Sequence, residues 1–363
     1  MDKNLEAKLN SFDPAVRNEA LQEVKKIYSA FNMHCHSFFS YNGYGYSPSM
    51  LVSLAKKLNW RSAMLVDFDV LDGVDEFLSA AKLLGVRAAA GMETRVFIPE
   101  LANDEINSPG EPGIAYHLGC GFTSSNVPAQ WQSFAANLRD KANGRTRVLV
   151  EKVNEYLCET PLVFDEVAKE FTPNGNVTER HVCEAYRKAA EKKFAGADLE
   201  AYWTEKIGSF TADGVKLEAL IRSKTMKRGG VGYVAPTPES FPTLDEMNKF
   251  IIGCGATPTL AWLNGLSSGE NDVDRLLDLH IKYGAAAATL IPDRNWRAAD
   301  AEKQAKLTAE LDRFVAAAAE RNIPLLAGTE MNAPGQLLAD DFTIAPLIKH
   351  LDIFTAGADA FAK

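Results

Sequence analysis

The segment FNMHCHSF, residues 31–38, is the stretch around which the rest of the chain is organised. His34 and His36 are two residues apart, and side chains alternate along a strand with a period of two, so both imidazoles point to the same side. Imidazole is a suitable ligand for zinc, manganese or iron. A His-x-His pair also occurs by chance on a polar strand face. The pair therefore predicts a metal site only if carboxylates or further histidines follow other strands.

The composition is that of an ordinary globular protein. The chain has 363 residues, of which 46% are hydrophobic and 24% charged. This length fits two domains, or one α/β barrel with an insertion. Lysine and arginine total 39, aspartate and glutamate 48, and the net charge is -9. An acidic chain without a basic cluster argues against nucleic-acid binding, although a local cationic pocket for one phosphate remains compatible with it.

The cysteines and the first residues indicate the compartment. Five cysteines are scattered along the chain and never form a Cys-x-x-Cys motif, which is typical of reduced thiols in a cytoplasmic protein. The opening MDKNLEAK is charged and lacks the apolar core of a signal peptide. No apolar run approaches the roughly 18 residues that a membrane span needs. We therefore expect a cytoplasmic protein that does not enter a membrane.

Short apolar segments alternate with helical ones on both sides of a long helical region. This alternation predicts a parallel α/β sheet or barrel. Between its two parts the periodicity is mainly helical, which predicts an insertion. The sequence thus divides into an N-terminal helical extension (1–30), the first part of a barrel (31–122), a helical insertion (123–235) and the second part of the barrel (236–363). The expected strands cover residues 31–37, 63–67, 86–90, 114–119, 257–262, 286–291 and 323–328.

Ionisable side chains follow several of the expected strands. In a parallel barrel the carboxyl ends of the strands converge on one face, where active sites are built. Several strands that each offer a histidine or a carboxylate there are a stronger signal than the first pair alone. A mixed set of nitrogen and oxygen ligands suits zinc, manganese or iron better than calcium or magnesium. The candidates are His34, His36, Asp67, Asp69, Glu93, His117 and Glu330.

The order and spacing of these segments resemble the PHP (polymerase and histidinol phosphatase) family, metal-dependent phosphoesterases on a distorted seven-stranded βα barrel. Residues 32–37 (NMHCHS) resemble the family's opening Asp-Leu-His-x-His-Thr, and residues 66–69 (VDFD) resemble its Thr-Asp-His-Asp. Gly-Met-Glu at 91–93 resembles its Gly-x-Glu, and His-Leu-Gly at 117–119 matches a segment of many members. The resemblance is specific over residues 31–122. It implies a distorted (β/α)7 barrel of the PHP type with a helical insertion.

The departures from the family pattern are grouped. Positions that hold metal ligands in the family carry Tyr41 or Asn42, Phe68, Trp262 and Asn332 here. Together these replacements remove one of the three metal sites of the family and halve a second.

The ligands that remain imply one firm metal site. Carried over residue by residue, that site takes His34, His36, Glu93 and Glu330, with glutamate in place of the family's aspartate. A second, weaker metal would share Glu93 and add His117. The resemblance therefore implies a divalent metal, zinc, manganese or iron, with one firm site and room for a second.

Five further residues are candidates for catalysis. Asp67 and Asp69 would orient a histidine ligand or accept a proton, or they cap the following loop. Arg95 and Arg294 follow strands and would bind a phosphate, or they form ordinary surface salt bridges. His181 lies in a segment that resembles an Arg-Pro-His segment in the inserted domain of some family members. It reaches the site or has a structural role in the insertion.

Three functions remain open at this stage. The first is a metal-dependent hydrolase, a phosphoesterase that uses a metal-activated water on a small phosphorylated metabolite. The second is a degenerate module that binds metal and ligand without turnover, which the replacements at Phe68, Trp262 and Asn332 favour. The third is another metal-dependent barrel enzyme with a substrate that is not a phosphate ester. The sequence gives no oligomeric state.

Overall fold

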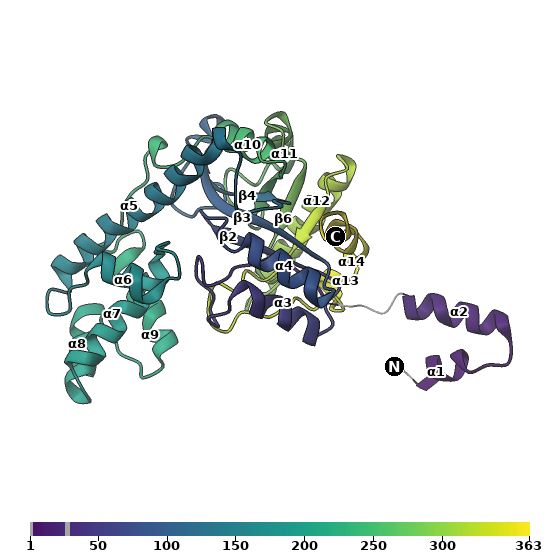
Figure 1. Ribbon diagram of the computed structural model, residues 1–363, viewed down its shortest axis with the longest axis horizontal. Helices are drawn as coiled ribbons and strands as arrows, with labels where there is room; N and C mark the ends of the chain where they lie inside the picture. Colours follow the sequence, from purple (N-terminus) through teal and green to yellow (C-terminus); the bar gives the residue numbers. More distant parts are fainter. Residues whose placement is uncertain (1–2, 26–29) are drawn as a thin grey trace.

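A computed structural model describes residues 3–25 and 30–363 of the chain. Seven strands form one sheet in which neighbours follow the order of the sequence. A parallel bridge between Cys35 and Glu330 brings the end of the sheet back to its first strand, so the barrel is nearly closed (Figure 1). The predicted seven-stranded α/β barrel is confirmed. Its strands are β1 (Asn32–Cys35), β2 (Ala63–Phe68), β3 (Ala88–Phe97), β4 (Ile114–Cys120), β5 (Thr257–Trp262), β6 (Ala287–Leu290) and β7 (Leu325–Ala327).

The direction of β4 departs from the expected parallel arrangement. It runs antiparallel to both β3 and β5, whereas the other neighbouring pairs are parallel. A parallel neighbour needs a crossover, usually a helix, that carries the chain back along the sheet. The connection from β3 to β4 holds only a short 3-10 helix, Pro99–Leu101, and β3 itself runs on to Phe97. Glu93 therefore lies inside a strand and not after its end.

Helices with one buried face cover the outside of the barrel. The side-chain oxygen of Ser47 accepts a hydrogen bond from the Met50 amide and caps the first of them, with Pro48 at its first position. Gly85 ends the next in the left-handed conformation (φ 64°), which glycine adopts without strain. These helices are α3 (Pro48–Lys57), α4 (Val74–Leu84), α10 (Leu244–Gly253), α11 (Val273–Lys282), α12 (Ala301–Glu320), α13 (Ala345–Ile348) and α14 (Leu351–Phe361).

The helical region between β4 and β5 builds a second lobe with its own hydrophobic core. Trp203 and Tyr186 are fully buried at its centre. Figure 1 shows this lobe beside the barrel, joined to it by the long helix α5. A single π-helical turn, Arg222–Met226, continues the last helix of the lobe. The helices are α5 (Gln132–Tyr156), α6 (Phe164–Phe171), α7 (Glu179–Lys193), α8 (Ala197–Ile207) and α9 (Gly214–Ile221).

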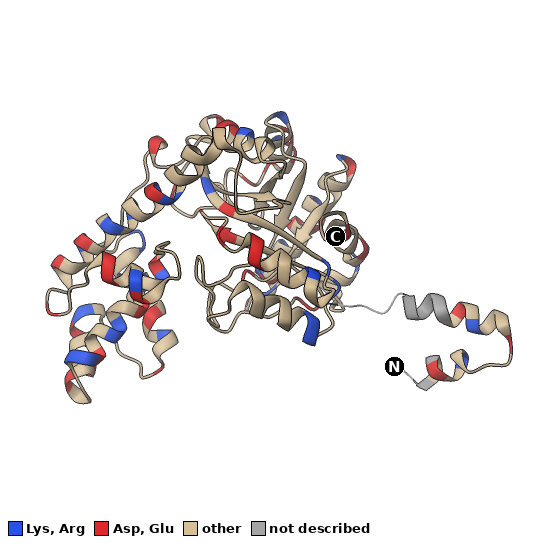
Figure 2. Cartoon of the chain, viewed as in Figure 1, with Lys and Arg blue, Asp and Glu red and all other residues tan. Residues whose placement is uncertain are grey.

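Two helices precede the barrel. They are α1 (Lys3–Leu9) and α2 (Pro14–Lys25), and a carboxylate oxygen of Asp13 caps the second by accepting from the Ala15 amide at 2.8 Å. Residues 1–2 and 26–29 of the expected extension lie outside the described residues. Figure 2 shows basic and acidic residues interspersed along the helices of the second lobe. Among the described helices, none combines the length and the apolar character that crossing a membrane requires.

Candidate functional site

Two histidines and one glutamate meet inside the barrel mouth. Oε2 of Glu93 on β3 lies 3.2 Å from Nε2 of His34 on β1 and 3.1 Å from Nε2 of His36, which directly follows β1. All three side chains are buried. In the described part of the chain they are the group with ligand atoms within 4.8 Å of one another that could hold a metal ion. The structure thus brings together three of the five predicted ligands.

The electrostatics of this group fit a cation. Burial alone would raise the pKa of Glu93, but the charges and hydrogen bonds of His34 and His36 outweigh it and lower that pKa to about 2. Nδ1 of His34 is buried without a hydrogen-bond partner, and Nε2 of His36 is buried 3.1 Å from Oε2 of Glu93. Buried polar atoms normally have partners, and a metal ion would satisfy such a nitrogen. The donor set of two imidazoles and one carboxylate suits zinc, manganese or iron.

Asp67 lies behind the group rather than on the open side. Its carboxylate accepts hydrogen bonds from the Ser37 amide at 2.7 Å, the Ser37 hydroxyl at 2.6 Å and the Ser40 hydroxyl at 2.7 Å. Burial raises the pKa of Asp67, although His36 and the two serines oppose that shift. Asp67 is therefore a supporting residue. Ser37 and Ser40 were not among the residues predicted for the site. The only sequence feature that could have pointed to them is their position directly after the histidine pair.

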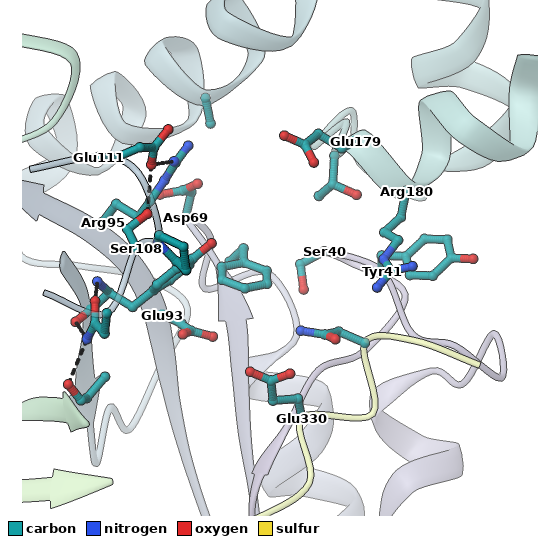
Figure 3. Close-up of a pocket in the computed structure, with 18 of the residues that line it drawn as sticks. Ser40, Tyr41, Asp69, Glu93, Arg95, Ser108, Glu111, Glu179, Arg180 and Glu330 are labelled. Carbon is teal, nitrogen blue, oxygen red and sulfur yellow. Dashed lines mark hydrogen bonds and ion pairs between the residues drawn. The ribbon is translucent and has the colours of Figure 1, made fainter. Parts of the chain in front are cut away.

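A cavity of about 670 Å³ opens from the histidines toward the helical lobe. Figure 3 shows Asp69, Glu93 and Glu330 on the barrel side, with Glu179 and Arg180 facing them from the lobe. Basic side chains line the cavity from both sides, and only part of them are paired with carboxylates. These side chains are Arg95, Arg145, Arg180, Arg222, Lys227, Arg228 and Arg294.

Asp69 is directed into this cavity by a strained backbone. Its φ is 59°, in the left-handed region that residues other than glycine rarely adopt. The Thr94 hydroxyl donates to its carboxylate at 2.6 Å. Burial raises the pKa of Asp69, while Arg145 and Arg95 oppose the shift. Strained backbone of this kind is common at functional sites.

The two predicted arginines line the cavity, and each has a carboxylate partner. Nη1 of Arg95 lies 2.9 Å from Glu111, and its guanidinium stacks over the Phe241 ring at 4.4 Å. Nη2 of Arg294 lies 2.7 Å from Oε2 of Glu330, and 45% of the Arg294 side chain is exposed. Each arginine therefore forms a salt bridge and still lines the cavity, where a ligand can reach it.

Glu330 does not complete the group of His34, His36 and Glu93. Its carboxylate is held by Arg294 and by Gln336, whose Nε2 donates at 3.2 Å. The backbone at Glu330 is left-handed (φ 65°), which turns the chain at the end of the barrel. The expectation of a fourth ligand is not met in this conformation because the glutamate has other partners. It lines the same cavity, so it stays close to the site.

His117 was predicted as a metal ligand, but the structure places its side chain away from His34, His36 and Glu93. The strand β4 is antiparallel, and Tyr116 lines the cavity while the next side chain, His117, points to the outer face. There its Nε2 lies 2.6 Å from Oδ1 of Asn248, and its ring packs against His280 at 5.6 Å. In the described structure His117 therefore does not join Glu93 in a group that could hold a metal.

His181 also lies away from the cavity lining. Its Nδ1 accepts a hydrogen bond from the Thr178 amide at 3.1 Å and forms a capping box at the start of α7. Its ring touches Tyr41 edge-on at 5.1 Å. The structural alternative for His181 is the one that the contacts support.

Two of the residues that stand where the family has ligands fill space with aromatic rings. Phe68 stacks on the His36 imidazole at 4.4 Å with an interplanar angle of 19°. Trp262 stacks on Phe314 at 4.3 Å. Neither ring can bind a metal, so these two positions make packing contacts and hold no ligand.

No family model matches the chain, and no curated protein matches it. Several solved structures share its fold, including the two that follow. One is an amidohydrolase from Chromobacterium violaceum with bound sulfate and no metal, with a TM-score of 0.58, 16% identity, and coverage of 89% of this chain and 96% of that one. The other, from Bifidobacterium adolescentis, is described as a candidate metal-dependent phosphoesterase, with a TM-score of 0.58, 19% identity, and coverage of 88% and 96%. At these identities the similarity establishes the fold alone.

The buried histidines His117 and His280, which pack against each other outside the barrel, predict a fold that is less stable in acid. Burial lowers the pKa of His117 to about 4, against the opposing hydrogen bond that Nε2 of His117 donates to Oδ1 of Asn248, and burial also lowers the pKa of His280. The unfolded chain, with a histidine pKa near 6.5, then binds more protons below that pH, so stability falls as the pH drops from about 6.5 towards 4. His117 alone should cost about 2 kcal/mol at pH 5.

Urea unfolding at pH 7.5 and pH 5 measures this loss of stability. The variant His117→Gln keeps an amide that can hydrogen-bond Asn248 but cannot titrate, so its stability should change less between the two pH values. An equal change in the variant and the natural protein would contradict the assignment to His117.

Proposed function

We propose that this chain is a metal-dependent hydrolase of the PHP type, a phosphoesterase that acts on a small phosphorylated molecule. The observation that carries the proposal is the buried group of His34, His36 and Glu93 at the inner end of a cavity lined by guanidinium groups. A carboxylate and two imidazoles suit a divalent metal, and planar guanidinium groups suit phosphate oxygens. The resemblance in sequence and the shared barrel fold support the same function.

We propose one metal, zinc, manganese or iron, held by His34, His36 and Glu93. The metal supplies Lewis acidity and a water of lowered pKa. Glu93 keeps its negative charge because its pKa is held near 2. Asp67 and the serines that bond to it keep this group in place from behind.

The other cavity residues bind the substrate and move protons. Arg294 is partly exposed and exchanges Glu330 for a phosphate oxygen when substrate enters. Arg95 holds its place over Phe241 and adds positive charge on the β3 side. Asp69, whose pKa is raised by burial, lies where it can take up or return a proton.

The domain boundaries and the location of the protein stay proposals. We propose that residues 123–235 form a unit that covers the substrate cavity, because its residues Arg145 and Arg222 line that cavity and its core is separate. We also propose a cytoplasmic location, which the free state of all five cysteines supports.

The alternative of a binding module without turnover keeps support from two contacts. Phe68 packs directly on a ligand histidine, and Glu330 is bound to Arg294 instead of the group. Another metal-dependent barrel enzyme, acting on a substrate without phosphate, is the third option. All three functions share the metal group, and they differ in whether the protein turns a substrate over and in which substrate the cavity accepts.

Metal analysis followed by a substrate panel tests the proposal. Protein purified without chelator should contain about one divalent metal per chain and should hydrolyse some phosphomonoesters or phosphodiesters when loaded with manganese, iron or zinc. Chelation should remove this activity, and readdition of metal should restore it. Bound metal with no turnover of any ester favours the binding module, and turnover of esters or amides without phosphate favours the third option. Protein that takes up no metal contradicts all three.

A further inference from the structure

We propose that Ser40 is a positioning residue that fixes the tautomer of His36, so that the Nε2 lone pair faces the metal position. The benefit of this tautomer for metal binding rests on the proposed metal function. The tautomer itself depends only on the hydrogen bonds around the buried His36.

The direction of these hydrogen bonds follows from counting protons. The Ser37 amide can only donate, and it donates to Oδ1 of Asp67 at 2.7 Å. The Ser40 hydroxyl donates its one proton to the same oxygen at 2.7 Å. Oγ of Ser40 then has lone pairs left and lies 3.3 Å from Nδ1 of His36. The only hydrogen bond that can form there is one in which His36 donates, so Nδ1 carries a proton.

A proton on Nδ1 leaves Nε2 of the neutral imidazole as a lone pair. That atom is buried and lies 3.1 Å from Oε2 of Glu93. Two lone pairs that face each other at this distance repel unless a proton or a metal ion is bound to one of them. The arrangement is therefore prepared for a cation, and Ser40 is the residue that excludes the opposite tautomer.

Packing alone would leave the orientation of the ring undecided. Phe68 stacks on the His36 imidazole at 4.4 Å and fixes the plane of the ring. A 180° flip about the Cβ–Cγ bond would keep the ring in that plane and exchange Nδ1 with Cδ2 and Nε2 with Cε1 at little cost in packing. The hydrogen bond to Ser40 distinguishes the two orientations. His34 has no such partner on its buried Nδ1 in the described structure, so the two histidines are not equivalent.

Nitrogen NMR on the full chain tests the tautomer directly. In protein labelled with ¹⁵N-histidine, with His36 assigned by its loss in His36→Asn, we expect Nδ1 to be protonated at pH 8.5 before any metal is added. An unprotonated Nδ1 in the natural protein would overturn the proposal. This measurement needs neither metal nor activity, so its outcome is independent of whether the proposed hydrolase function holds.

Variants test what the hydrogen bond does. Ser40→Ala should shift His36 towards the Nε2-protonated tautomer and weaken Zn²⁺ binding, measured by competition with a chromophoric chelator, by about 10- to 100-fold. Ser37→Ala is the matched control, because Ser37 is equally buried and its hydroxyl also donates to Asp67, while the hydrogen bond to the His36 ring comes from Ser40. The Zn²⁺ affinity of Ser37→Ala should change by less than about 3-fold. Ser40→Thr keeps the hydroxyl and should restore the tautomer.

Two outcomes would count against the role of Ser40. An unchanged tautomer and an unchanged Zn²⁺ affinity in Ser40→Ala would overturn it, and so would equal losses in Ser40→Ala and Ser37→Ala. Thermal unfolding of each variant identifies a general loss of structure. If the natural protein binds no Zn²⁺, the metal function fails while the tautomer measurement still decides whether Ser40 orients the ring.

Discussion

Replacing Glu93 with glutamine should abolish metal binding and lower the rate of phosphoester hydrolysis by about 10³-fold or more, equivalent to about 4 kcal/mol of transition-state stabilisation. Glu93 is the only carboxylate in the group with His34 and His36, and it lies within 3.2 Å of both imidazoles. An amide keeps the shape of the side chain but not its charge. The fold should survive, since an amide can still hydrogen-bond a buried histidine.

The measurements are metal content by atomic spectroscopy and the hydrolysis rate with metal in excess. Glu111→Gln is the matched control: Glu111 lines the same cavity and pairs with Arg95, but it does not belong to the metal group. It should keep its metal while its substrate affinity changes. A Glu93→Gln protein that retains one metal per chain and its full rate would exclude the proposed centre.

The sequence was most informative where the spacing of residues along the chain determines which side chains lie on the same face of a strand. His34 and His36 share one strand face because strand side chains alternate, and the structure holds both against Glu93. Glu93 follows an apolar segment that pairs with β2, in register Phe68 with Glu93. These three residues could be placed from local pattern and order alone.

The pattern could not give the direction of a strand. Alternation along β4 places the side chains of Tyr116 and His117 on opposite faces of the sheet, whatever the direction of the strand. It does not say which of the two faces the cavity, and in the structure that residue is Tyr116. The tryptophan at 262 shows a related limit, because its packing on Phe314 depends on a helix far along the chain. The expectation of a uniformly parallel barrel therefore did not anticipate that His117 lies against Asn248.

The basic side chains that the helical lobe adds to the cavity were the other part that the sequence did not predict. Arg145 and Arg222 lie on helices of the insertion, where arginine normally belongs to the solvated face. In the structure, burial lowers the pKa of Arg145 to about 10, and its guanidinium stacks on Phe241 at 4.3 Å. Only the position of the lobe against the barrel turns these helix arginines into cavity residues, and helical periodicity carries no information about that position.

The largest structural effect should come from Gly328→Ala, which we expect to cost about 3 kcal/mol or more of stability and to weaken metal binding. A Cβ added at Gly328 would lie 2.4 Å from the His34 amide nitrogen and 2.3 Å from Oδ1 of Asn32. Both are held in place, because the Asn32 amide donates to the Thr329 hydroxyl at 2.7 Å and the Glu330 amide donates to the His34 carbonyl at 2.8 Å. The strand that carries His34 would have to move.

Urea unfolding and Zn²⁺ affinity measure the two consequences of Gly328→Ala separately. Gly144→Ala is the control, because Gly144 lies in the helix α5 with no atom within 4 Å of an added Cβ. Alanine there should raise stability by up to about 1 kcal/mol and leave Zn²⁺ affinity unchanged. Stability and affinity equal to the natural protein in Gly328→Ala would mean that β1 and the segment after β7 do not approach this closely. A loss of both would show that the contact which closes the barrel also positions the first metal ligand.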